Sequence, residues 1–335
     1  MVTTGEILQS MVGAFVRGDS EAFYKTVRSL IVEERKKDHQ RLASELERIL
    51  SSQEARSLSV LTPVEAPQAE LPRDKELGTF LVEWWIPARN PATLVLDAMV
   101  EEALERAVDE NRRSELLRAH GLKPVSRLLF YGPPGCGKTV AAEVLATQMY
   151  LPIALVRFDA VISSYLGQTA SNLKKVFDFA RLRPMVLFFD EFDAIGKSRE
   201  DENEHGELKR VINSFLQMLD RYKGEAIIIA ATNHENMLDT ALWRRFDDVV
   251  YFPKPTKSQI TELLGKLLLH VGVDGLAIPK MVSAMEGMAY SDVEQIARNA
   301  IKRCLLRGAS RVEPADLHDA VMRQRNKVFR DVRDP

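Results

Sequence analysis

The middle of the chain alternates short apolar runs with longer amphipathic stretches. The runs have the length and the branched or aromatic composition of buried strands, and they cover 128–131, 153–158, 185–189, 226–231 and 249–252. Apolar residues at helical spacing fill the intervals near 138–149, 169–182 and 207–221. Strands that alternate with helices predict an α/β fold, in which helices cover both faces of a parallel sheet.

The pattern changes after two prolines, Pro253 and Pro255. Beyond them we find no further strand, and apolar positions recur at helical spacing over 257–271, 278–288, 291–306 and 314–328. We therefore expect a large α/β subdomain over 76–254 and a small all-α lid over 255–335.

The N-terminal segment, 1–60, has a helical pattern that breaks at Gly18, and Ser20 is a candidate cap for the second helix. We interpret the charged run 33–38 as a solvated helix face, with a partner-binding or coiled-coil surface as the alternative. The segment is too short for a sizeable core, so we expect it to pack on the body or to pair with another chain. Three prolines within 61–75 predict a linker.

Paired tryptophans, Trp84 and Trp85, follow the expected linker. We interpret them as part of a strand that anchors the next domain by core packing, in preference to a ligand box. A long helical pattern then runs from Thr93 to His120 and ends at Gly121, which suits a left-handed helix C-cap.

Composition narrows the class of protein. The chain has 335 residues, and 46 Lys and Arg against 48 Asp and Glu leave a net charge of −2. This balance argues against a polycation that binds nucleic acid over its whole surface. Two cysteines, Cys136 and Cys304, exclude a disulfide scaffold and fit a reducing compartment. Without a secretory signal or a run of the ~18–20 apolar residues that span a bilayer, we expect a cytoplasmic protein with no membrane span.

The segment GPPGCGKT matches the phosphate-loop pattern G-x-x-x-x-G-K-[ST] without a gap. A predicted strand leads into it, and a helix begins at Thr139. Glycines let backbone N–H groups turn toward a phosphate, and the helix N-terminus adds positive partial charge. Lys138 is expected to reach the β- and γ-phosphates, and Thr139 to ligate Mg²⁺. The pattern therefore predicts a P-loop NTPase fold with a nucleotide site formed by Gly132, Pro133, Pro134, Gly135, Cys136, Gly137, Lys138, Thr139 and Val140.

Cys136 lies inside this loop. We interpret it as a small filler residue. The alternative is a thiol whose pKa is lowered by the electropositive loop, and in that case alkylation of the thiol would block nucleotide binding.

Polar residues follow two of the predicted strands. Asp190 and Glu191 come after 185–189, and Asn233 comes shortly after 226–231. Ligands of an open parallel sheet bind beyond the carboxyl ends of its strands. We expect Asp190 to hold Mg²⁺ through water, Glu191 to deprotonate the attacking water, and Asn233 to hydrogen-bond the γ-phosphate and that water. The alternatives are a helix N-cap with a first-turn acid, and an asparagine that forms a turn.

Three segments, GPPGCGKT, FFDEFDAIG and IIIAATNHENMLDTALWRRFD, follow one another in this order. Together they resemble the AAA family of ATPases in its narrow sense, over roughly 93–330. The tandem Arg244 and Arg245 is similar to the meiotic clade of katanin, spastin and the ESCRT-disassembly ATPase, whereas 117–124 looks like a bacterial single-ring member. The resemblance implies a homohexameric ring with ATP and Mg²⁺ between subunits, in which Arg244 and Arg245 act as arginine fingers on the neighbouring subunit's ATP.

Tyr165, Leu166 and Gly167 resemble the family's first pore loop, whose aromatic–aliphatic–glycine triplet grips an extended polypeptide. A half-buried tyrosine on a connecting loop is the alternative. The polar stretch 197–205 falls where a second pore loop would lie, and it equally suits a mobile surface loop. At 289–292 the sequence departs from the family pattern, and no second-sensor arginine is found.

These observations predict an ATPase that acts as an unfoldase or chaperone, threading or disassembling protein substrates through a central pore. The alternative is a nucleotide-switched scaffold that controls a partner without threading it, and a nucleic-acid motor or loader is a third, less favoured function. The N-terminal segment would select the substrate, recruit an adaptor or stabilise the ring. No His-Glu-x-x-His peptidase motif is present, so degradation of a substrate would need a separate protease.

Overall fold

The computed structural model describes residues 26–27, 29–31, 71–91, 94–162, 168–192, 204–233, 243–269, 271–272 and 278–331. The chain divides into two compact units, Met1–Ala69 and Glu70–Pro335. The described residues of the first unit are helical, and Val27 and Ile31, four positions apart, are buried. The helices expected over 1–60 otherwise lie outside the described residues.

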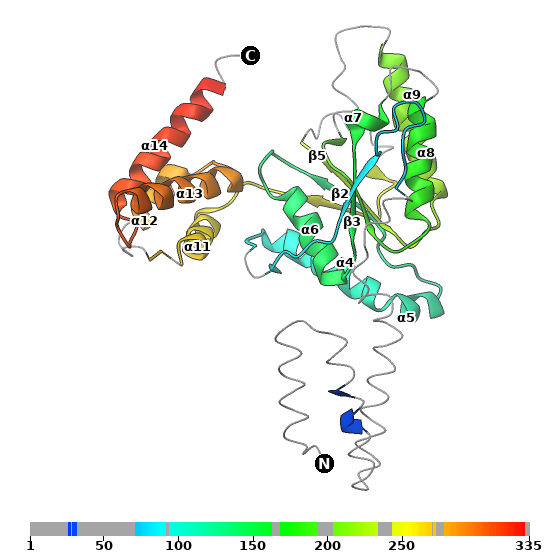
Figure 1. Cartoon of the computed structure of the whole chain (residues 1–335), viewed down its shortest axis with the longest axis horizontal. Helices are drawn as coiled ribbons and strands as arrows, with labels where there is room; N and C mark the ends of the chain where they lie inside the picture. The colour runs from blue at the N-terminus through cyan, green and yellow to red at the C-terminus, as the bar shows by residue number, and fades with distance from the viewer. Residues whose placement is uncertain are drawn as a thin grey trace. The chain divides into compact units, whose positions relative to one another are not determined.

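The second unit contains the predicted strands and helices in the predicted order, with two differences (Figure 1). The helical pattern expected from Thr93 to His120 forms two helices that meet at Arg113, and a short helix, Phe158–Val161, follows the strand expected over 153–158. Its strands are β1 (Val82–Trp85), β2 (Arg127–Tyr131), β3 (Ile153–Val156), β4 (Val186–Phe189), β5 (Ile227–Thr232) and β6 (Asp248–Tyr251). The helices before β6 are α4 (Ala98–Arg112), α5 (Ser114–Ala119), α6 (Lys138–Met149), α7 (Phe158–Val161), α8 (Gln168–Ala180) and α9 (Glu204–Arg221). After β6 come α11 (Lys257–Leu268), α12 (Ile278–Met285), α13 (Tyr290–Leu306) and α14 (Pro314–Asp331). None of the described helices is long and apolar enough to cross a bilayer.

The six strands form one sheet in the order β1-β3-β4-β5-β2-β6. All neighbours pair in parallel except β1, which is antiparallel to β3. The predicted α/β fold is therefore confirmed. The order of the strands also positions the candidate site. Because β5 lies between β2 and β4 and all three are parallel, the segments that follow these strands leave the sheet at the same edge.

The two faces of the sheet have separate hydrophobic cores, because side chains alternate along each strand. Leu128 and Phe130 of β2 pack with α4 and α6, whereas Leu129 packs with α8 and α9 on the opposite face. All three side chains are fully buried. Both cores hold β2 in place, so the loop that follows it starts from a rigid position.

The chain enters the sheet through β1, the strand that contains the paired tryptophans, as expected. Trp84 packs edge-on against Phe179 of α8, with ring centroids 5.9 Å apart. Residues 71–75, the end of the expected linker, are also folded onto this edge. Asp74 there is 5% exposed and accepts a hydrogen bond of 2.8 Å from Asn172 Nδ2. The described end of the proline-rich segment is thus part of the body.

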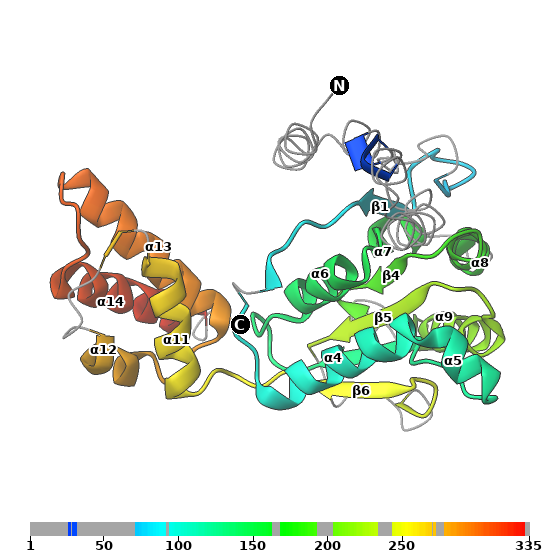
Figure 2. The ribbon, with the colours of Figure 1, turned by 90° about the horizontal axis from the view of Figure 1, so that it is seen from below.

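Helices α11, α12, α13 and α14 gather into one helical group (Figure 2), which corresponds to the expected lid. Thr256 and Gln259 form a capping box that begins α11. Gln259 Nε2 also donates to the carbonyl of Leu96, 3.0 Å away, in the segment before α4. The hydrophobic core on the α4 and α6 face continues into this helical group. The lid is therefore attached to the sheet by packing as well as by the chain.

Candidate functional site

The loop between β2 and α6 takes its shape from glycines. Gly132, Gly135 and Gly137 have φ angles of 138°, 72° and 93°, which side-chain-bearing residues rarely adopt. A Cβ atom on Gly132 would lie 2.4 Å from the carbonyl oxygen of Phe252. These glycines allow the backbone to turn tightly beside β6. The segment therefore forms the strand–loop–helix unit that the phosphate-loop pattern predicts.

Two polar side chains of the loop are held in defined places. Lys138 is 6% exposed, and its Nζ donates to the carbonyl oxygens of Gly132 and Pro133 at 2.7 and 2.9 Å. The ammonium group is thus kept against the loop itself. Thr139 Oγ1 donates to Asp190 Oδ2 at 2.6 Å, across 51 residues of sequence. The structure therefore brings together the two residues expected to hold Mg²⁺.

Glu191 directly follows this pair. Its backbone N–H donates to Asp190 Oδ1 at 2.9 Å, and its side chain is exposed. Its φ angle is 50°, an uncommon left-handed value that costs a non-glycine residue about 1–3 kcal/mol. Residues with such strained backbone angles cluster at active sites, although helix ends such as Tyr150 of this chain also adopt them. The chain therefore turns sharply here and leaves an exposed carboxylate at the edge of the site.

Asn233 follows β5, the strand between β4 and β2. In the register, Ala230 is paired with Phe189 of β4, and Thr232 with Tyr131 of β2. Asn233 therefore leaves the sheet between the phosphate loop and the Asp190–Glu191 pair. β5 is thus the neighbour of both strands, and Asn233, the residue that follows it, is half-buried.

The expected arginine fingers lie just before β6. Arg244 is exposed, and Arg245 forms an ion pair with Asp220 of α9, with 3.1 Å between Nε and Oδ2. The preceding Trp243 packs edge-on against Tyr131, with ring centroids 4.9 Å apart. Trp243 thus ties this segment to the end of β2, while the ion pair directs Arg245 toward α9.

Several expected site residues lie outside the described residues. They include the pore-loop triplet Tyr165, Leu166 and Gly167, and most of the polar stretch 197–205. The last two residues of that stretch, Glu204 and His205, begin α9. An expected second pore loop would therefore end at the start of this helix.

The Cys136 side chain is packed inside the loop. It is 2% exposed, and burial raises the pKa of its thiol, although the nearby Lys138 acts in the opposite direction. A raised pKa leaves less of the reactive thiolate at neutral pH. The structure therefore favours the filler interpretation over that of an activated thiol.

We expect Cys136 to react slowly with iodoacetamide in the folded protein. A Cys304→Ser variant would leave Cys136 as the single thiol, and mass spectrometry would follow its alkylation. The rate at pH 7 should be at least about tenfold lower than in the urea-unfolded variant, because the thiol is both buried and protonated. Equal rates in the two states would contradict this packing.

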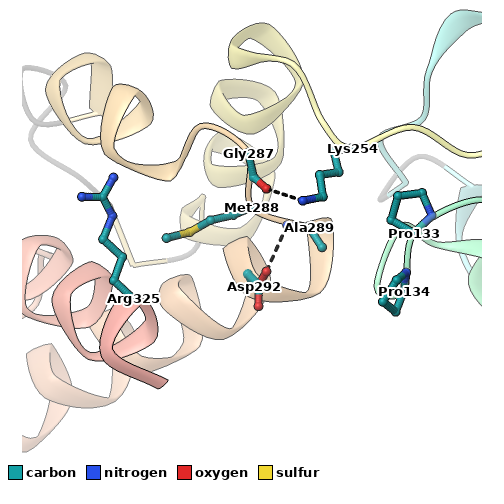
Figure 3. A pocket seen from close by; sticks show the side chains of 8 residues that line it. All are labelled: Pro133, Pro134, Lys254, Gly287, Met288, Ala289, Asp292 and Arg325. Atoms are coloured by element: carbon teal, nitrogen blue, oxygen red, sulfur yellow. Dashed lines mark hydrogen bonds between the residues drawn. The ribbon is translucent and has the colours of Figure 1, made fainter. Parts of the chain in front are cut away.

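The lid contacts the phosphate loop directly, which sequence patterns did not show. The backbone N–H of Ser291, in the first turn of α13, donates to the Gly135 carbonyl at 3.1 Å. A Cβ on Gly135 would lie 2.1 Å from Ser291 Oγ, so this glycine also makes room for the lid. Lys254 Nζ donates to the carbonyl of Gly287 at 2.9 Å (Figure 3).

A pocket of about 440 Å³ lies beside this contact. Its lining comes from the loop, from the chain just after β6 and from the lid, and consists of Pro133, Pro134, Lys254, Gly287, Met288, Ala289, Asp292 and Arg325 (Figure 3). The volume falls within the ~300–1,000 Å³ range of small-molecule sites. The junction of loop and lid is thus open on one side.

The loop residues suit a magnesium nucleotide. Among the described residues, no cluster of three or more His, Cys, Asp and Glu side chains could enclose a metal ion. Mg²⁺ with a nucleotide does not need such a cage, because it is held by one or two protein groups, phosphates and water. Thr139 and Asp190 would supply these two groups, and the glycine-shaped turn would leave space for the phosphates.

Comparison with known proteins agrees with this geometry. Residues 128–254 match the family described as the ATPase family associated with various cellular activities (AAA). The chain is 38% identical over 317 residues to the uncharacterized AAA family ATPase y4kL of Sinorhizobium fredii, covering 95% of this chain and 94% of that protein. It is 32% identical over 212 residues to the proteasome-activating nucleotidase of Thermococcus onnurineus, covering 61% of this chain and 53% of that protein.

The chain is also similar to the peroxisomal ATPase PEX6 of Komagataella pastoris, with 35% identity over 193 residues that cover 53% of this chain and 16% of that protein. The likeness to the katanin and spastin clade is not tested by these relatives and stays a prediction. The match to the family over the phosphate loop and strands β2 to β6, with the similarity to y4kL along nearly the whole length, shows that this chain belongs to the AAA family of ATPases.

Proposed function

We propose that this chain binds ATP with Mg²⁺ at the loop between β2 and α6 and hydrolyses it. Membership of the AAA ATPase family supports ATPase activity. The observation that carries the proposal is the 2.6 Å hydrogen bond from Thr139 to Asp190, with the left-handed Glu191 next to it. This arrangement joins a phosphate-binding loop to an exposed carboxylate that can act as a base.

Each residue has a distinct proposed part. Backbone N–H groups of the loop and Lys138 would bind the phosphates, and Thr139 and Asp190 would hold Mg²⁺, which when bound supplies positive charge to the phosphate oxygens. Glu191 would orient a water molecule and accept its proton. Asn233 would hydrogen-bond that water and the γ-phosphate.

We further propose that hydrolysis takes place between the subunits of a homohexameric ring. Arg245 supports this arrangement, because it is held by Asp220 of α9 and is 34% exposed. A partly exposed cation fixed by an ion pair can be presented to a neighbouring subunit's nucleotide, where a guanidinium stabilises the charge that develops on the γ-phosphoryl group. Arg244, which is exposed, would act beside it.

We propose that this ATPase remodels proteins by threading them through a pore. Similarity to a proteasome-activating nucleotidase and to a peroxisomal ATPase supports a role on protein substrates. A separate protease or an adaptor would then be a partner of the ring. A scaffold switched by nucleotide remains the second candidate, favoured by the direct bond between Gly135 of the loop and Ser291 of the lid, which can relay the nucleotide state.

Threading predicts that an unfolded polypeptide stimulates the ATPase of the wild-type ring. In the Tyr165→Ala variant the ratio of stimulated to basal rate should fall to about one, because the aromatic side chain that contacts the polypeptide is missing. ATP turnover with and without an unstructured protein such as casein measures this ratio.

Tyr150→Ala is a matched control, since it removes a tyrosine that is 74% exposed at the end of α6 remote from the loop. This variant should keep the stimulation. If the polypeptide has no effect on any of the three proteins, threading is not supported and the scaffold is favoured.

A further inference from the structure

A buried hydroxyl without a partner stands next to the phosphate loop. Tyr290, the first residue of α13, is 8% exposed, and its Oη has no hydrogen-bond partner. In the part of the chain that the structure describes, Trp84 Nε1 and Asp316 Oδ1 share this condition. Asp316 Oδ1 nevertheless lies 3.3 Å from Arg303 Nε in an ion pair. Trp84 belongs to β1, the edge strand, which does not neighbour the strands of the candidate site. Tyr290 is the one of the three that adjoins the candidate site.

The position of Tyr290 is set by the contact between lid and loop. The next residue, Ser291, donates its backbone N–H to the Gly135 carbonyl. The Tyr290 ring belongs to the same hydrophobic core as Cys136 of the loop. The adjoining Ala289 borders the pocket of about 440 Å³, so the start of α13 is not packed on every side.

The hydroxyl keeps its proton at neutral pH. Burial, together with the nearby Asp97, raises the pKa of Tyr290 to about 12. A neutral phenol can both donate and accept a hydrogen bond. It can therefore pair with either kind of polar atom on a ligand.

The hydroxyl does not contribute to the packing seen here. A buried donor or acceptor without a partner destabilises the folded state, and phenylalanine would fill the same space without this cost. Tyr222 shows the ordinary arrangement, because its Oη donates to the Ala180 carbonyl at 2.8 Å and accepts from Ala226 N at 3.2 Å. Buried polar groups normally have such partners, so we expect the Tyr290 hydroxyl to form a hydrogen bond in another state of the protein.

We propose that Tyr290 Oη is a hydrogen-bonding group for the nucleoside half of the bound nucleotide, and that it contributes to the selection of that ligand. The inference rests on the proposed nucleotide binding. Phosphates held by the loop leave the ribose and the base at its border, and ribose hydroxyls and base nitrogens are partners that a phenol can take. Oη is enclosed in this structure, so a small shift of α13 toward the open pocket would admit the nucleoside.

Tyr290→Phe removes the hydroxyl and keeps the ring, and Tyr222→Phe is the matched control in the same chain. Calorimetric titration of the full chain with ADP should show a Kd about fivefold to thirtyfold higher for Tyr290→Phe, the loss expected for one hydrogen bond of about 1–2 kcal/mol. Without nucleotide, its Tm should equal or exceed that of the wild type. Tyr222→Phe should have a lower Tm and an unchanged Kd, because its hydroxyl bonds only within the body.

Inorganic triphosphate and 2′-deoxyADP locate the contact. Triphosphate should bind wild type and Tyr290→Phe equally, because it has no nucleoside. Equal affinity of both proteins for 2′-deoxyADP would assign the bond to the ribose 2′-hydroxyl, and an undiminished difference would assign it to the base or to the ribose 3′-hydroxyl.

Two results would overturn the proposal. One is an ADP affinity that Tyr290→Phe leaves unchanged, and the other is a fall in Tm as large as that of Tyr222→Phe, which would mean that the hydroxyl has a partner within the protein. A wild type that binds neither ADP nor triphosphate would instead remove the nucleotide site on which the proposal rests.

Discussion

Glu191→Gln is expected to lower the ATP hydrolysis rate by about 10²–10⁴-fold, the contribution typical of a general base. The amide keeps the shape of the side chain but cannot accept the proton of the attacking water. Nucleotide affinity should stay close to that of the wild type, because the phosphate contacts come from the loop and Lys138. Phosphate release and fluorescent-nucleotide titration measure the two properties separately.

Glu191→Gly is a control that the backbone of this site makes possible. Glycine adopts the φ angle of 50° without strain, so the variant should be as stable as the wild type or more stable, by up to about 1 kcal/mol. It should be as inactive as Glu191→Gln, since both lack the carboxylate. Appreciable hydrolysis by either variant would show that the base lies elsewhere.

Arg245→Ala is expected to bind ATP and to lose about 10³-fold or more of its hydrolysis, as arginine fingers contribute that much to phosphoryl transfer. The fold should be little affected, because the ion pair with Asp220 is partly exposed and such pairs contribute at most about 1 kcal/mol. Turnover rate, nucleotide affinity and Tm of the variant check the three parts of this prediction.

Asp220→Asn breaks the same ion pair and keeps the guanidinium. Its hydrolysis rate should lie between those of the wild type and Arg245→Ala, because the guanidinium is present but is no longer held by the Asp220 carboxylate. This comparison separates the charge of Arg245 from the ion pair that positions it. Mixing inactive Arg245→Ala and Glu191→Gln subunits should restore some hydrolysis, because a mixed ring contains interfaces with an intact glutamate facing an intact arginine. No recovery at any mixing ratio would contradict action between subunits.

The phosphate loop and the order of the strands along the chain could be predicted from the sequence, because their signals are local. A strand, a loop of six residues (132–137) and a helix are contiguous in GPPGCGKT and its flanks, and residues other than glycine rarely adopt the φ angles of Gly132, Gly135 and Gly137. Buried strands carry continuous apolar runs, and their carboxyl ends show where polar residues such as Asp190 meet a ligand.

Other features depend on residues that are far apart in the chain. The pairing of Asp220 with Arg245 and the packing of Asp74 against α8 leave no periodic pattern, since each joins surfaces that meet only after folding. The proline pattern therefore predicts a linker up to residue 75, although Asp74 is packed against the body.

The α/β class, the phosphate loop and the likeness to AAA ATPases follow from the sequence alone, because glycine positions, strand hydrophobicity and motif order are properties of short stretches of chain. The position of β5 between β2 and β4, which brings Asn233 between the loop and Glu191, is seen in the folded chain and not in any one segment. The same holds for the contact of Ser291 with Gly135 and for the Tyr290 hydroxyl without a partner. Gly135 and Ser291 are more than 150 residues apart in the chain, and the contact between loop and lid is specified by the packing of whole surfaces.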